Sequence, residues 1–79
     1  MNPDRFTETY DRYSSAYLFL QACTMGNIRC TAADLLAGIE RLDRACDEME
    51  AEQGNKGLFR GMASLYRKEA LELAEEKRQ

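Results

Sequence analysis

Residues 32–49 read AADLLAGIERLDRACDEM. Apolar side chains recur every three or four residues in this stretch, at Ala32, Leu35, Ile39, Leu42, Cys46 and Met49. This spacing places them on one stripe of an α-helix, with the charged side chains on the other faces. Thr31 and Asp34 resemble a capping box, with aspartate in place of the usual glutamate or glutamine, and Gly54 supplies a stop. We therefore predict an amphipathic helix that starts after Thr31 and ends at about Gln53.

The preceding residues predict a first helix from Pro3 to about Met25. Asn2 is a good N-cap, Pro3 suits the first helical position, and Gly26 with Asn27 ends the helix. Its expected core stripe follows helical spacing and consists of Phe6, Tyr10, Tyr13, Tyr17 and Leu20.

A third helix is predicted from near Lys56 or Gly57 to about Lys77. Its expected apolar face is formed by Phe59, Met62, Tyr66 and Leu73, flanked by Leu58, Leu65 and Ala70. Leu71 is expected at the surface. No stretch alternates as a strand would. The sequence thus predicts a single all-α domain over residues 1–79, either a three-helix bundle or a helical hairpin with a packed N-terminal helix.

Composition narrows the class of protein. An apolar fraction of 44% and a charged fraction of 32% are typical of a globular chain. The net charge of −3 argues against a general nucleic-acid binder. No signal peptide is recognisable at the N-terminus, and the longest apolar-rich stretch, Ala16 to Met25, is too short to span a bilayer. The odd number of cysteines favours the cytoplasm over a secreted disulfide framework.

Catalytic and metal-binding patterns are missing from the sequence. The chain has no histidine and no C-x-x-C pair. Cys46 lies on an apolar stripe, where burial should raise its pKa, so we interpret it as a small core residue. Cys23 and Cys30 flank the first turn and could meet in space, but their spacing is not a metal signature. We expect neither an enzyme nor a metal or cofactor.

Two glycine-bearing turns could suggest nucleotide or DNA binding, and neither pattern is complete. Residues 54–57 lack the full phosphate-loop motif and no strand precedes them. A helix-turn-helix around residues 26–38 would present an acidic recognition helix to the phosphates.

The first helix has more apolar surface than one core stripe requires. Its surplus side chains are Leu18, Phe19, Ala22 and Met25. We expect this face to be an interface with a partner or a second copy, the alternative being burial within the monomer.

Charged residues form two further stripes. An acidic ridge on the second helix consists of Glu40, Asp43, Asp47 and Glu50, and a basic stripe on the third helix consists of Lys56, Arg60, Arg67 and Arg78. The ridge is either a solvated face or a docking surface for a basic partner. The two stripes could also pair within the bundle or across a dimer.

These features predict a non-catalytic helical protein-interaction module that binds and modulates a larger protein of unknown identity, with a homodimer as a further option. By analogy of size and helicity, it could be an inhibitor or anti-activator of the kind phages encode, including the anti-CRISPR class, or a co-chaperone or assembly factor of a secretion system. The alternative is a small nucleic-acid-associated regulator that uses the basic stripe.

Overall fold

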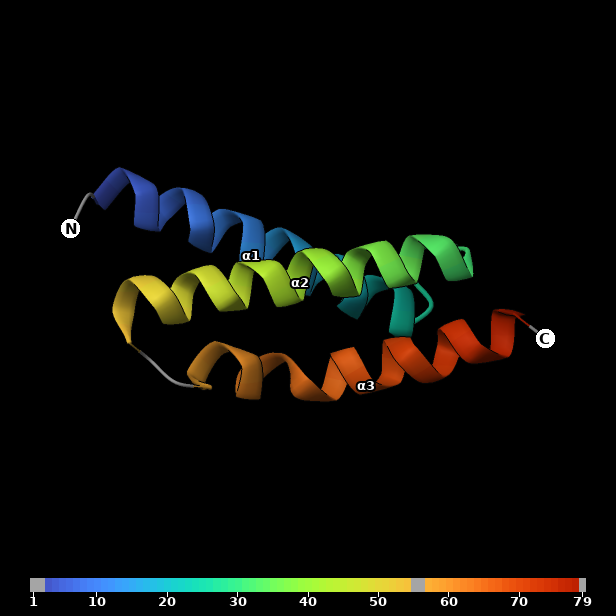
Figure 1. Cartoon of the computed structure of the whole chain (residues 1–79). Coiled ribbons are helices and arrows are strands. Elements are labelled where there is room, and N and C mark those ends of the chain that lie inside the picture. Colours follow the sequence, from blue (N-terminus) through green and yellow to red (C-terminus); the bar gives the residue numbers. More distant parts are fainter. Residues whose placement is uncertain (1–2, 55–56, 79) are drawn as a thin grey trace.

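The structure of the chain, a computed structural model, describes residues 3–54 and 57–78. Helix α1 spans Pro3–Thr24, α2 spans Ala32–Gln53 and α3 spans Leu58–Arg78. The helices alternate in direction and each packs against the other two, which confirms the all-α three-helix bundle (Figure 1). The bundle is elongated, with principal extents of 44 × 20 × 17 Å.

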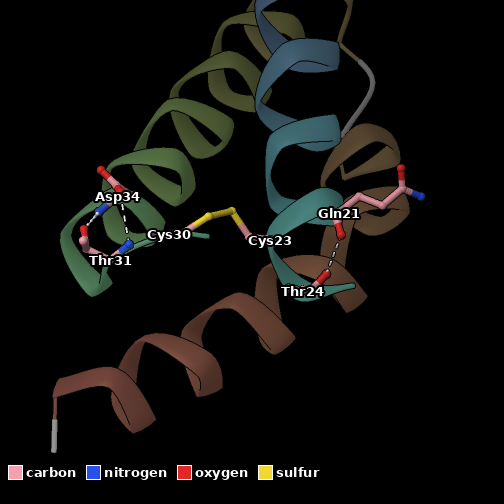
Figure 2. Close-up of a disulfide and its surroundings, with 6 residues drawn as sticks. All are labelled: Gln21, Cys23, Thr24, Cys30, Thr31 and Asp34. Carbon is pink, nitrogen blue, oxygen red and sulfur yellow. Dashed lines mark hydrogen bonds between the residues drawn. A yellow bond between two sulfur atoms is a disulfide. The ribbon is translucent and has the colours of Figure 1, made fainter. Parts of the chain in front are cut away.

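The ends of α2 are fixed by local hydrogen bonds, as predicted. The Thr31 hydroxyl accepts a hydrogen bond from the Asp34 amide at 3.1 Å, and the Asp34 carboxylate accepts one from the Thr31 amide at 3.0 Å (Figure 2). These bonds satisfy two amides at the helix start and lower the pKa of Asp34. At the other end Gly54 has a φ of 69° and donates its amide to the Glu50 carbonyl at 2.8 Å. Glycine adopts this left-handed conformation without steric cost.

The other two helices differ slightly from their predicted bounds. Helix α1 ends at Thr24, one residue earlier than expected, and α3 extends to Arg78 rather than Lys77. The predicted N-cap Asn2 and the predicted helical start at Lys56 lie outside the described residues.

A disulfide joins the two sides of the first turn. Cys23 lies in the last turn of α1 and Cys30 lies just before α2, with their Cα atoms 6.2 Å apart (Figure 2). Both side chains are buried. The bond therefore fixes the end of α1 to the start of α2, which makes the α1–α2 pair the covalently constrained part of the bundle.

The core is centred on the predicted stripe of α2. Its fully or nearly fully buried members are Leu35, Ile39, Leu42, Cys46 and Met49, while Ala32 at the helix start is only half-buried.

The core faces of α1 and α3 differ from their predicted positions. On α1 the buried side chains are Thr9, Tyr13, Ala16, Leu20 and Cys23, and Tyr10 is exposed. On α3 the buried side chains are Ala63, Ala70 and Ala74. The predicted face of α3 was wrong for Met62, which is exposed, and Leu71 packs half-buried against the core rather than lying free at the surface. Small residues allow α3 to approach the other helices closely, so alanines rather than the larger apolar residues occupy the centre.

Candidate protein-interaction face

Charged pairs link α2 and α3 along the line where the two helices meet, which we call a seam. Arg67 donates two hydrogen bonds to the Asp43 carboxylate, both at 2.9 Å. Arg60 pairs with Glu50 at 3.2 Å and with Asp47. These hydrogen bonds raise the pKa of both arginines. Because the groups are partly exposed, each pair adds at most about 1 kcal/mol to stability.

The acidic ridge and the basic stripe therefore meet within the monomer. Glu40, the remaining ridge residue, pairs with Arg44 on its own helix at 2.9 Å. Of the basic stripe, Arg78 is exposed at the end of α3, and Lys56 lies outside the described residues. A docking role for either stripe stays a prediction, but most of the charge that would support it is already neutralised inside the bundle.

The seam between α1 and α2 is bridged by two ion pairs. Arg5 pairs with Glu52 at 3.0 Å and Arg12 pairs with Glu48 at 2.7 Å.

Phe19 packs in this same seam. A Cβ placed on Gly38 would lie 2.9 Å from the Phe19 ring, which shows how closely the ring covers the glycine. The Arg41 guanidinium lies over the Phe19 ring, 5.5 Å from its centroid. Phe19 is thus half-buried against α2 and is not the centre of a free face.

The predicted surplus face of α1 is consequently divided. Leu18 and Met25 are exposed, whereas Phe19 and Ala22 are half-buried. The structure brings Leu18 together with Met62 of α3, which the sequence placed at the core.

Aromatic and hydroxyl groups hold the third seam, between α1 and α3. The Tyr13 hydroxyl donates to the Phe59 carbonyl at 3.0 Å, and the Gln21 amide donates to the Tyr66 hydroxyl at 3.1 Å. The rings of Tyr13 and Phe59 meet edge to face with centroids 5.3 Å apart. Burial, together with nearby Cys46 and tyrosine groups, raises the pKa of Tyr13 to about 12. Among the residues that the structure describes, no ion pair joins these two helices.

Large apolar side chains are exposed on α1, in the turn after it and on α3. They are Tyr10 (44% exposed) and Leu18 (59%) on α1, Met25 (63%) in the turn that follows α1, and Leu58 (54%), Met62 (59%) and Leu65 (59%) on α3. We call these six residues the α1/α3 face. A groove of about 290 Å³ runs between the helices, lined by Tyr10, Tyr13, Ser14, Tyr17, Leu18 and Met62. The groove has apolar walls and hydroxyl groups at its edge, an arrangement suited to a protein side chain.

The spacing of the alanines was the signal in the sequence that could have located this face. Ala63, Ala70 and Ala74 recur at seven and four residues, which fits a helical stripe as well as the larger apolar side chains do. Choosing the alanine stripe as the core would have left Leu58, Met62 and Leu65 outside.

Three further possibilities concern metal binding, the free cysteine Cys46 and a membrane-spanning helix. In residues 3–54 and 57–78 no group of three or more cysteine, aspartate or glutamate side chains is placed to hold a metal ion. Cys46 is buried, and burial raises the pKa of its thiol, as expected. None of the described helices is both long and apolar enough to cross a membrane.

The chain matches no protein-family model, and no significant match to it was found among curated proteins or solved structures. The surface of the bundle is therefore the basis for assigning a function.

Proposed function

We propose that this protein is a non-catalytic helical interaction module that binds a larger protein through the α1/α3 face. The observation that supports the proposal is the contrast between the three seams. Charged pairs line the α1/α2 and α2/α3 seams, whereas the α1/α3 seam is bordered by exposed leucine, methionine and tyrosine side chains. An apolar patch on one side of a small domain is typical of a protein-binding surface.

The composition of the face supports the same proposal. Tyrosine and methionine are enriched at interfaces, because tyrosine offers a large rigid ring with a hydroxyl and methionine adapts its shape to a partner. The face combines Tyr10 and Met62 around one groove, with Leu18 between them. Binding there would stabilise a bundle whose small size limits its own core.

Photocrosslinking tests the proposal in the native cell. A photoreactive phenylalanine analogue at position 18 should form a crosslink to one protein. The same analogue at position 36 is the matched control, because Leu36 is also an exposed leucine but lies on α2. Identical crosslinking patterns from the two positions would refute the α1/α3 face as the binding surface. The identity of the crosslinked protein would then separate an inhibitor or anti-activator from an assembly co-chaperone.

The nucleic-acid alternative has less support. Two of its four basic residues, Arg60 and Arg67, already pair with carboxylates of α2. A nucleic acid would have to displace these carboxylates before it could use the basic stripe.

The cellular compartment depends on the disulfide. The cytoplasm was predicted from the odd number of cysteines, but the structure pairs Cys23 with Cys30 and leaves Cys46 buried. Disulfides persist mainly in oxidising compartments, so this pair favours such a compartment. Alkylation of free thiols in intact cells, followed by mass spectrometry, decides the question. A labelled Cys23 would indicate the cytoplasm, and an unlabelled, linked pair would indicate an oxidising environment.

A further inference from the structure

One exposed stripe of α3 is apolar in the first half of the helix and acidic in the second half. Its residues recur at alternating spacings of four and three, in the order Leu58, Met62, Leu65, Glu69, Glu72 and Glu76. All six are exposed. The first three belong to the α1/α3 face, and the last three continue the same line as carboxylates.

The acidic half of this stripe is not neutralised by the bundle. Among residues 3–54 and 57–78, no arginine or lysine lies within ion-pair distance of Glu69, Glu72 or Glu76. The basic residues of the same half are Lys68, Lys77 and Arg78. Lys68 precedes Glu72 by four residues and neighbours it along the helix without forming an ion pair, whereas Lys77 and Arg78 point away from the stripe at about 100° per residue. This contrasts with α2, where six acidic residues pair with arginines of the same chain.

We infer that the partner segment is an amphipathic α-helix with an apolar face and with lysine or arginine at one end. The inference rests on the proposed function and names the class of partner for the same face. The apolar part of such a helix would lie over Leu18 and Met62, and its basic end would reach Glu69, Glu72 and Glu76. From residue 58 to residue 76 the stripe is about 27 Å long at 1.5 Å per residue, which is the length of a helix of about 18 residues.

The wall contributed by α1 fits this occupant. The residues of α1 that line the groove are Tyr10, Tyr13, Ser14, Tyr17 and Leu18, and none of them is charged. An apolar helix in this groove therefore contacts uncharged side chains of α1, and its end meets the carboxylates at the far end of α3.

A second copy of the chain fits less well. If two copies met with α3 parallel, their acidic halves would face one another and repel. If they met antiparallel, each acidic half would lie against the apolar half of the other α3 or against the uncharged wall of α1. The first arrangement brings like charges together and the second places carboxylates against apolar side chains, so the charge pattern favours a basic partner.

Two synthetic peptides test the inference on the folded, disulfide-bonded protein. Both are helices of about 18 residues with leucine along one face. One carries three lysines at one end and the other carries three glutamates at the same positions. Fluorescence anisotropy at low salt should show that the lysine peptide binds about tenfold more tightly, and high salt should reduce this ratio.

Variants of the protein locate the two parts of the surface. Replacing the stripe carboxylates together, Glu69→Gln, Glu72→Gln and Glu76→Gln, should bring the two peptide affinities within about twofold of each other. Glu75→Gln is the charge control, since Glu75 is exposed but off the stripe, and it should leave the ratio unchanged. Leu18→Ala with Met62→Ala should weaken both peptides by about tenfold.

Equal affinities for the two peptides, or no measurable binding of either, would overturn the inference. So would a stable dimer detected by light scattering that Leu18→Ala abolishes, because a second copy would then occupy the face. None of these results depends on the crosslinking experiment. A single partner crosslinked at position 18 but lacking a basic helix would retain the proposed function and refute only this inference.

Discussion

Replacing Gly38 by alanine probes how closely α1 and α2 pack. A Cβ at position 38 would lie 2.9 Å from the Phe19 ring and 3.1 Å from a Leu20 methyl group. Gly61 on α3 is the matched control, because a Cβ there meets nothing within 4 Å. Both glycines are helical and neither has a positive φ.

Two effects of opposite sign determine the result. Alanine in place of a helical glycine stabilises by about 1 kcal/mol through helix propensity, and at Gly61 this should be the whole effect. At Gly38 the added methyl group overpacks a close contact, which typically costs about 1–3 kcal/mol. Leu20 is fully buried and cannot move away freely. Gly38→Ala should therefore be neutral to destabilising by about 2 kcal/mol, while Gly61→Ala is stabilising.

Thermal unfolding followed by circular dichroism measures the difference. For a domain of this size each kcal/mol shifts the Tm by about 4–8 °C, so the two variants should be separated by at least that amount. Phe19→Ala combined with Gly38→Ala should cost less than the sum of the single changes, because the smaller side chain makes room for the methyl group. An equal rise in Tm for Gly38→Ala and Gly61→Ala would refute the placement of Phe19 against α2.

Three further predictions concern stability. Leu42→Ala should cost about 2–5 kcal/mol, because Leu42 is buried at the centre of the core, and a loss below about 0.5 kcal/mol in urea unfolding would remove it from the core. Reducing the Cys23–Cys30 bond should lower the free energy of unfolding by about 2.5 kcal/mol through loop-closure entropy, which corresponds to about 10–20 °C in Tm. The Tm of a Cys23→Ser, Cys30→Ser double variant should not change when reductant is added. The raised pKa of Tyr13 means that the folded protein holds the hydroxyl proton more tightly than the unfolded chain does. The resulting contribution to the free energy of unfolding is complete below pH 10 and is lost as the pH rises from 10 towards 12. Tyr13→Phe should make this alkaline decline shallower, and an unchanged decline would show that another group causes it.

The sequence predicted α2 well because its apolar stripe is regular and its ends carry strong signals. Leu35, Leu42 and Met49 are buried as expected, and the capping box of Thr31 and Asp34 forms as expected. These features depend on residues close together in the chain, so periodicity and capping rules are sufficient to find them.

The α1/α3 face could not be predicted in the same way. Whether Met62 or Ala63 points to the core depends on how near α3 approaches the other helices, and this distance is a property of the assembled bundle. Hydrophobicity favours the methionine, whereas in the bundle Ala63 is buried, Met62 is exposed and Arg67 reaches Asp43. The sequence left open whether Phe19 lies at an interface or within the monomer, because its contact, Gly38, is distant in the chain and leaves space only when α1 and α2 pack together.

Methionine oxidation tests the α1/α3 face most directly. Met25 and Met62 are largely exposed and Met49 is fully buried, so Met49 serves as an internal control for oxidation. In the purified protein, hydrogen peroxide followed by mass spectrometry should show rapid oxidation of Met25 and Met62 and slow oxidation of Met49. In the native cell, a partner on the α1/α3 face should protect Met62 strongly while Met49 stays unreactive. Equal oxidation of Met62 in the cell and in the purified protein would contradict the proposal that this face is bound.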